Sequence, residues 1–203
     1  MCATATSLTA RTSLGASPSD EDLAARAQRG CMASFEELLR RFQVPLLNFL
    51  RHAGPAADAE DVLQETFLRA YSRLHYYRPQ WRFTTWLFTI ARRTSINYHR
   101  RPHPLADDAA TRNAVSAAAG PAEAAAAADD RRYLWSAAQR ALGADEVTAL
   151  WLHYVEEIPV GEIAAILDRT TVAVKTMMFR ARKKLLPLVG ALGPTVEVFH
   201  ERT

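Results

Sequence analysis

The sequence predicts an all-α protein of two small helical domains joined by a flexible linker. Ala, Leu, Arg and Glu dominate its 203 residues, and the alternating pattern of a half-buried strand is scarce, so the chain favours helices. Residues 102–128 contain almost no large apolar side chain and cannot bury enough surface to offset the entropy of folding. Because 49% of the residues are hydrophobic, the chain can still bury a core outside this linker.

Four helices are expected in the first domain, residues 19–101, after a disordered tail over residues 1–18. Ser and Asp caps, the Gly30 stop and the Gly54-Pro55 break set their limits, and Pro45 is expected to bend the second helix. A loop around His75 to Trp81 precedes the fourth helix. The expected bounds are Ser19 or Asp20 to Gly30, Ser34 to Arg51, a third helix that begins at Asp58, and about Thr84 to Arg101.

Apolar side chains at helical spacing assign the inner faces of the third and fourth helices. On the third helix the expected inner residues are Leu63, Phe67, Ala70, Tyr71 and Leu74. On the fourth they are Leu87, Ile90, Ala91, Thr94 and Tyr98.

Four short helices are expected in the second domain, residues 129–189, before a C-terminal tail over residues 190–203. Their expected bounds are Arg131 to Leu142, Asp145 to Val155, Val160 to Leu167, and Thr171 to Leu186. The last two are separated by a tight turn, Asp168 to Thr170, which is the spacing of a helix-turn-helix.

The last of these helices has the two faces that a DNA recognition helix needs. Val174, Met178, Ala181 and Leu185 form a core stripe at i, i+4, i+7 and i+11. The opposite face offers cations for phosphates or guanine edges and small or flat side chains for thymine methyls. A helical hairpin with a solvated basic face is the alternative. The residues of that face are Thr171, Lys175, Thr176, Phe179, Arg180 and Lys183.

Positive charge is separated from negative charge along the chain, although the net charge is only +3. Residues 66–106 contain eight Arg and no Asp or Glu, and the run from Arg169 to Val196 also lacks acids. Such separation predicts two surfaces that face a polyanion.

The third helix carries acidic side chains instead. Asp58, Asp61 and Glu65 lie at i, i+3 and i+7, with Gln64 and Leu68 on the adjoining outer surface. Acids early in a helix complement its dipole, and a carboxylate row beside an exposed leucine also fits a docking face for a basic partner protein. The residues alone leave both interpretations open.

The segment RPQWRFTTWLFTIARRTSINYHRR, residues 78–101, interleaves arginines with aromatic rings. Part of its apolar content belongs to the core stripe of the fourth helix. Tyr76, Tyr77, Trp81 and Phe83 remain, in or beside a loop where burying every ring is difficult. Because aromatic rings on a basic loop hold unpaired bases by stacking, the segment predicts contact with single-stranded nucleic acid.

Enzyme, metal and membrane functions find no support in the sequence. It has no glycine-rich phosphate loop, nucleophile elbow or zinc-protease motif, and its histidines lack metal-ligand spacing. Two unpaired cysteines and the lack of a long apolar run predict a cytoplasmic protein without membrane insertion, cofactor or metal.

Taken together, these parts resemble the extracytoplasmic-function (ECF) group of the bacterial sigma-70 family. FEELLRRF, DAEDVLQETFLRAY and FTTWLFTIARRTSINYHRR are similar to region 2 of the family, and EIAAILDRTTVAVKTMMFRARKKL is similar to region 4. The resemblance implies an alternative sigma factor that binds core RNA polymerase through the β′ clamp and the β flap. It also implies recognition of the −35 and −10 elements of promoter DNA, melting of the latter, and possible control by an anti-sigma factor.

The resemblance also assigns roles to residues of this chain. It implies clamp binding by Asp61, Gln64, Glu65 and Leu68. It implies −10 DNA binding, to duplex and to the melted non-template strand, by Tyr76, Tyr77, Trp81, Arg92, Arg93, Asn97 and Arg100. It implies −35 binding by the basic face of the helix from Thr171. Arg93 and Asn97 stand where the family usually has Asn and Asp, and Asp168 replaces the usual turn glycine, which an Asp tolerates better than most residues.

Two other functions remain open at this point. One is a helix-turn-helix regulator that binds duplex DNA without polymerase, which leaves the acidic face and the ring-rich loop unexplained. The other is a sigma-mimicking protein that titrates a regulator, which leaves the basic faces unexplained.

Overall fold

The computed structural model describes residues 17–100 and 133–189. All regular structure within these two ranges is helical, so the predicted all-α class is confirmed. The expected linker and C-terminal tail, and the expected N-terminal tail up to residue 16, lie outside the described residues. Across the described ranges, no helix combines the length and the apolarity that a membrane span requires.

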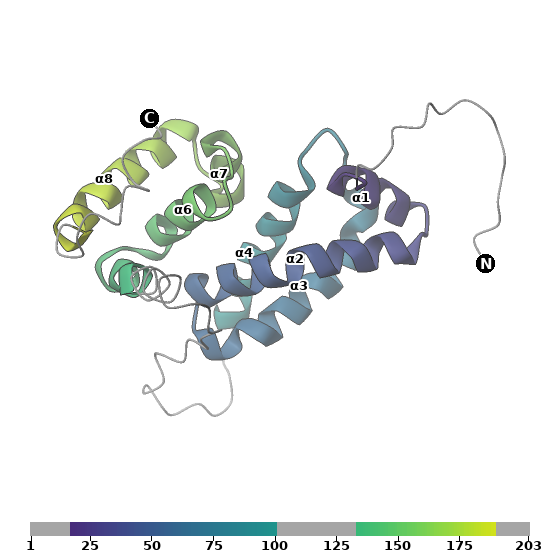
Figure 1. Cartoon of the computed structure of the whole chain (residues 1–203), viewed down its shortest axis with the longest axis horizontal. Helices are drawn as coiled ribbons and strands as arrows, with labels where there is room; N and C mark the ends of the chain where they lie inside the picture. The colour runs from purple at the N-terminus through teal and green to yellow at the C-terminus, as the bar shows by residue number, and fades with distance from the viewer. Residues whose placement is uncertain (1–16, 101–132, 190–203) are drawn as a thin grey trace.

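Four helices form an N-terminal bundle, in which α2 is the longest and α1 packs near its start (Figure 1). Ser19 caps α1 by accepting a hydrogen bond from the Asp22 N–H (3.1 Å), and Gly30, at φ 89°, follows its end. The helix α2 continues through Pro45. The bounds are Asp20–Gln28 for α1, Met32–Ala53 for α2, Ala59–Arg73 for α3 and Phe83–Arg100 for α4.

Aromatic pairs between α2 and α4 make the centre of this bundle. The rings of Phe42 and Phe83 lie 5.6 Å apart, and those of Phe49 and Phe88 lie edge to face at 5.1 Å. Such contacts add to the large apolar area that each ring buries. They hold α2 and α4 in a fixed relation.

One residue of the expected core stripes is misplaced. Tyr71 is exposed, with its ring at the bundle edge 5.1 Å from Phe35. Thr66, which the expected stripe does not include, is buried instead, and its hydroxyl donates to the Val62 carbonyl of its own helix (2.7 Å). The periodicity of apolar residues alone does not reveal such a self-satisfied threonine.

The C-terminal bundle contains a helical segment over residues 133–141, then α6 (Ala144–Tyr154), α7 (Val160–Leu167) and α8 (Thr171–Val189). The bounds of α7 and the start of α8 agree with the prediction. Asp168 ends α7 in the left-handed conformation (φ 56°, ψ 49°) that the turn requires. All four residues of the predicted α8 stripe are buried.

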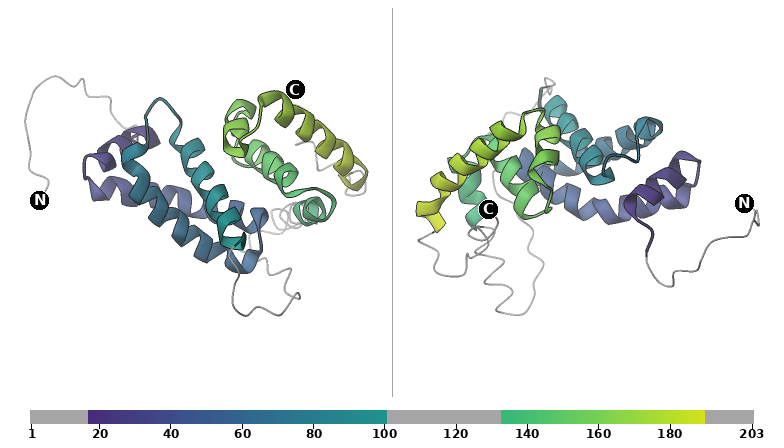
Figure 2. Two further views of the ribbon diagram at one scale, coloured as in Figure 1. Left: turned by 180° about the vertical axis from the view of Figure 1, so that it is seen from behind. Right: turned by 90° about the horizontal axis from the view of Figure 1, so that it is seen from above.

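The two bundles touch through α7 against α4 and α6 against α2 (Figure 2). The ring of His52 stacks on that of Trp151 at 3.8 Å. Glu162, in the first turn of α7, accepts a hydrogen bond from Thr85 of α4, and Asp145, in the first turn of α6, accepts one from Arg92 (2.9 Å). The contact therefore covers one side of α4.

Candidate functional site

The outer face of α3 presents an acidic patch with an exposed leucine. Asp61 and Gln64 are exposed, Glu65 is half-buried, and Leu68 exposes 71% of its surface. Arg69 binds Glu65 (2.5 Å), and the Tyr98 hydroxyl donates to Asp61 (3.4 Å). Burial and the negative charge of Asp61 raise the pKa of Tyr98. The four residues named from the sequence thus share one surface that can receive a basic, partly apolar partner.

Residues 75–82, here called the aromatic loop, connect α3 to α4. Tyr76 and Trp81 point into solvent and are 72% and 59% exposed. The rings of His75 and Tyr76 lie 3.9 Å apart. Two aromatic side chains of this loop are therefore available to stack with a flat ligand.

Tyr77 corrects the expectation that the rings in and beside this loop are open. It is only 3% exposed, and its ring packs 5.4 Å from those of Phe83 and Trp86. Its hydroxyl donates to the Trp81 carbonyl (2.7 Å), and burial raises its pKa to about 12. Phe83 is also buried. Both rings belong to the core, and the loop supplies the hydrogen-bond partner that the phenol of Tyr77 needs there.

The polar residues of α4 divide between two surfaces. Arg93, Asn97 and Arg100 are exposed and follow one another at i, i+4 and i+7, so they lie along one face. Arg92 is only 17% exposed and lies on the other side, bound to Asp145. The four side chains expected to act as one basic surface are therefore not presented together in this conformation.

The outer face of α8 presents all six residues expected of a recognition helix, and each of them is exposed. The Thr170 hydroxyl accepts from the Ala173 N–H (3.2 Å) and so fixes the start of α8. Lys184 and Arg169, at the margin of this face, bind Glu146 and Asp145 (2.9 and 2.7 Å). The helix can therefore offer cations, threonines and one aromatic ring to a groove of DNA.

No sequence pattern identifies the residues that tie the two bundles together. Asp145 and Glu162 occupy first turns of their helices, where an acid is ordinarily explained by the helix dipole. Their partners lie 53 and 77 residues away along the chain. No local pattern could have paired them.

Comparisons with known proteins place similar sequences over both bundles. Family models for Sigma-70 region 2 and for Sigma-70, region 4 match residues 38–103 and 137–185. The ECF RNA polymerase sigma-E factors of Salmonella typhimurium (strain LT2) and Escherichia coli (strain K12) are each 30% identical over 183 residues, which are 84% of this chain and 96% of theirs.

The fold is also similar to solved structures. CnrH, in complex with the cytosolic domain of CnrY, matches with a TM-score of 0.63 at 27% identity, over 85% of this chain and 97% of that one. The sigma factor RpoE of Bartonella quintana, in complex with the anti-sigma factor NepR, matches with a TM-score of 0.58 at 21% identity, over 77% and 96%. The second likeness concerns the fold alone.

Proposed function

The chain belongs to the ECF group of RNA polymerase sigma factors, and from this premise we propose that it binds core RNA polymerase and directs it to specific promoters. One observation carries the proposal: a single chain presents an acidic, leucine-bearing surface on α3 and separate basic surfaces on α4 and α8. A regulator that bound only duplex DNA would have no use for the first surface, and a protein that only bound a regulator would have no use for the others.

The acidic surface, Asp61, Gln64, Glu65 and Leu68, is the proposed contact with the β′ clamp of the polymerase. Its carboxylates would steer a basic partner into place, and Leu68 would lose its exposed apolar area on docking. A second contact, between the C-terminal bundle and the β flap, belongs to the same proposal.

The aromatic loop and α4 are the proposed reader of the −10 element. Arg93, Asn97 and Arg100 would hold duplex DNA, mainly by its phosphates. Tyr76 and Trp81 would then stack with a base turned out of the non-template strand, which offsets part of the cost of unstacking it. Tyr77 has a structural part in this proposal, since its ring is in the core.

The exposed face of α8 is the proposed reader of the −35 element. Lys175, Arg180 and Lys183 are exposed and would reach phosphates or guanine edges, and the exposed Thr171, Thr176 and Phe179 would make shorter contacts with bases. A protein regulator is a further candidate partner, since the similar protein CnrH forms a complex with the cytosolic domain of CnrY.

The test is assembly and initiation with purified components. The labelled chain should bind core polymerase in a fluorescence anisotropy titration, and the complex should start transcripts at defined positions on fragments of the source genome. Core polymerase alone should start none of these transcripts. Specific DNA binding that needs no polymerase, together with no affinity for core, would refute the proposal in favour of a separate DNA-binding regulator.

A further inference from the structure

The helix α1 supports the aromatic loop through two polar side chains. The Nε2 atom of Gln28 donates to the carbonyls of Leu74 (2.8 Å) and Tyr77 (2.7 Å), so a single amide group holds both ends of the turn that leads into the loop. Two helical turns earlier, Glu21 accepts a hydrogen bond from the N–H of Phe83 (3.0 Å), where α4 begins. Gln28 and Glu21 thus bind the two ends of the aromatic loop.

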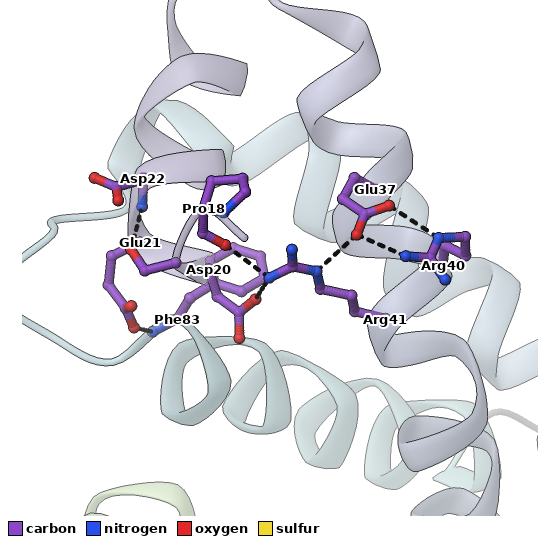
Figure 3. Close-up of polar contacts among 9 residues, drawn as sticks. Pro18, Asp20, Glu21, Asp22, Glu37, Arg40, Arg41 and Phe83 are labelled. Atoms are coloured by element: carbon purple, nitrogen blue, oxygen red, sulfur yellow. Dashed lines mark hydrogen bonds and ion pairs between the residues drawn. The ribbon is translucent and has the colours of Figure 1, made fainter. Parts of the chain in front are cut away.

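The support is itself anchored to α2, as Figure 3 shows. Arg41 donates from Nη1 to the Pro18 carbonyl (2.9 Å) and to Asp20 (2.8 Å), and from Nε to Glu37 (2.8 Å). Hydrogen bonds from Arg40 and Arg41 lower the pKa of Glu37 to about 2, so this carboxylate is charged at neutral pH. The position of α1 is therefore set by the long helix of the bundle.

Two further hydrogen bonds lie within the aromatic loop. The Tyr77 hydroxyl donates to the Trp81 carbonyl, and the Trp81 N–H donates to the Arg78 carbonyl (3.0 Å). Gln28 fixes Tyr77 at its carbonyl, and Tyr77 fixes Trp81 at its carbonyl. The chain of contacts runs from α1 to a ring that is open to solvent.

We propose that Gln28, assisted by Glu21, is a positioning residue for promoter opening, because it holds the aromatic loop in the shape that presents Trp81 and Tyr76 to an unpaired base. This inference rests on the proposed function. It adds a role for α1, which lies outside the residues that the region 2 model matches. An unsupported loop would lose conformational freedom when it captured a base, and that entropy would oppose the gain from stacking.

The first test needs no polymerase. Gln28→Met keeps the length of the side chain and removes its hydrogen-bond donors, and Gln43→Met makes the same change at an exposed position of α2. We expect Gln28→Met to raise amide exchange at Tyr77 and Trp81 about fivefold, the effect of losing an ordinary hydrogen bond, while the melting temperature stays close to wild type. Unchanged exchange at both amides would overturn the claim that Gln28 holds the loop.

The second test measures promoter opening by the complex with core polymerase, followed by permanganate reactivity of unpaired thymines. We expect Gln28→Met to slow opening about fivefold to tenfold, with closed-complex affinity and core affinity unchanged. On a template melted in advance the variant should match wild type. Gln43→Met should behave as wild type throughout.

A double variant separates positioning from general weakening. If Gln28 acts through Trp81, Gln28→Met should add almost nothing to the defect of Trp81→Ala. Additive defects, or equal slowing on the melted template, would overturn the inference. A wild-type chain that neither binds core nor opens promoters would instead refute the proposed function, so the two failures are distinguishable.

Discussion

Replacement of Asp145 by asparagine should raise the affinity of the free chain for duplex DNA. Asp145 Oδ1 accepts a hydrogen bond from Arg92 of α4, and Oδ2 accepts two from Arg169. Burial opposes ionisation of this carboxyl, but the hydrogen bonds from Arg169 and Arg92 prevail and lower its pKa, so it is charged at neutral pH. While it binds this carboxylate, Arg92 is only 17% exposed, so little of its guanidinium is available to a DNA phosphate. The substitution removes the competing charge.

The geometry of the pair sets the size of the effect. The side chains of Arg92 and Asp145 are 17% and 30% exposed, so the pair lies between a surface ion pair and a buried one. Allowing for solvent screening, we take the interaction free energy of this ion pair as about 1 kcal/mol. A free-energy change of this size corresponds to a decrease of about fivefold in Kd.

The assay is an anisotropy titration of labelled duplex DNA with the free chain at low salt. Loss of any negative charge strengthens DNA binding, so Glu146→Gln is the matched control: it lies in the same turn of α6 and binds Lys184 within its own bundle. Asp145→Asn should exceed this control, and its advantage should vanish in an Arg92→Ala background. Equal gains from the two substitutions, or a gain that persists without Arg92, would refute the competition.

Three other outcomes are expected. Asp61→Arg with Glu65→Arg should abolish core binding in a pull-down while unfolding stability falls by no more than about 1 kcal/mol, and retained binding would contradict the docking surface. Trp81→Ala should slow promoter opening without changing the melting temperature. Tyr77→Ala should instead lower the free energy of unfolding by about 3 kcal/mol or more, because its ring is in the core. Equal melting temperatures of the two variants would contradict the assignment of Tyr77 to the core and Trp81 to the surface. The pKa of Glu37 lies near 2 in the folded chain against 4.5 ordinarily, so its stabilising contribution is complete above pH 4.5 and declines as pH falls toward 2. Urea unfolding at several pH values should therefore show Glu37→Gln approaching wild type with acidification, and parallel curves would exclude the effect.

The sequence predicted the helices well because their limits are set locally. Caps, glycine stops and apolar periodicity act within a few residues, so the bounds of α7 and the buried stripe of α8 followed directly. The exposure of Leu68 and of the α8 face followed from the same periodicity. These features needed no knowledge of the rest of the fold.

The remainder depended on contacts between distant parts of the chain. The sequence predicts a solvent-exposed Tyr77, but its ring packs against Phe83 and Trp86, and its hydroxyl donates to the Trp81 carbonyl. Arg92 was expected beside Arg93 on a DNA-facing surface, but Asp145 binds it from the other bundle. No pattern marks Gln28 in the sequence, since it is one polar side chain on a short helix.

Asp168 holds the turn before α8 at a positive φ where a glycine would be the freer residue. An aspartate has fewer alternative backbone states than glycine, so the turn has less freedom to lose when α8 enters a groove of DNA. In the proposed −35 contact, α8 would therefore meet DNA at an angle that the turn already holds. Selectivity among promoter sequences would then rest on how well a groove fits a helix of fixed orientation, because tilting the helix to fit a mismatched groove would cost free energy.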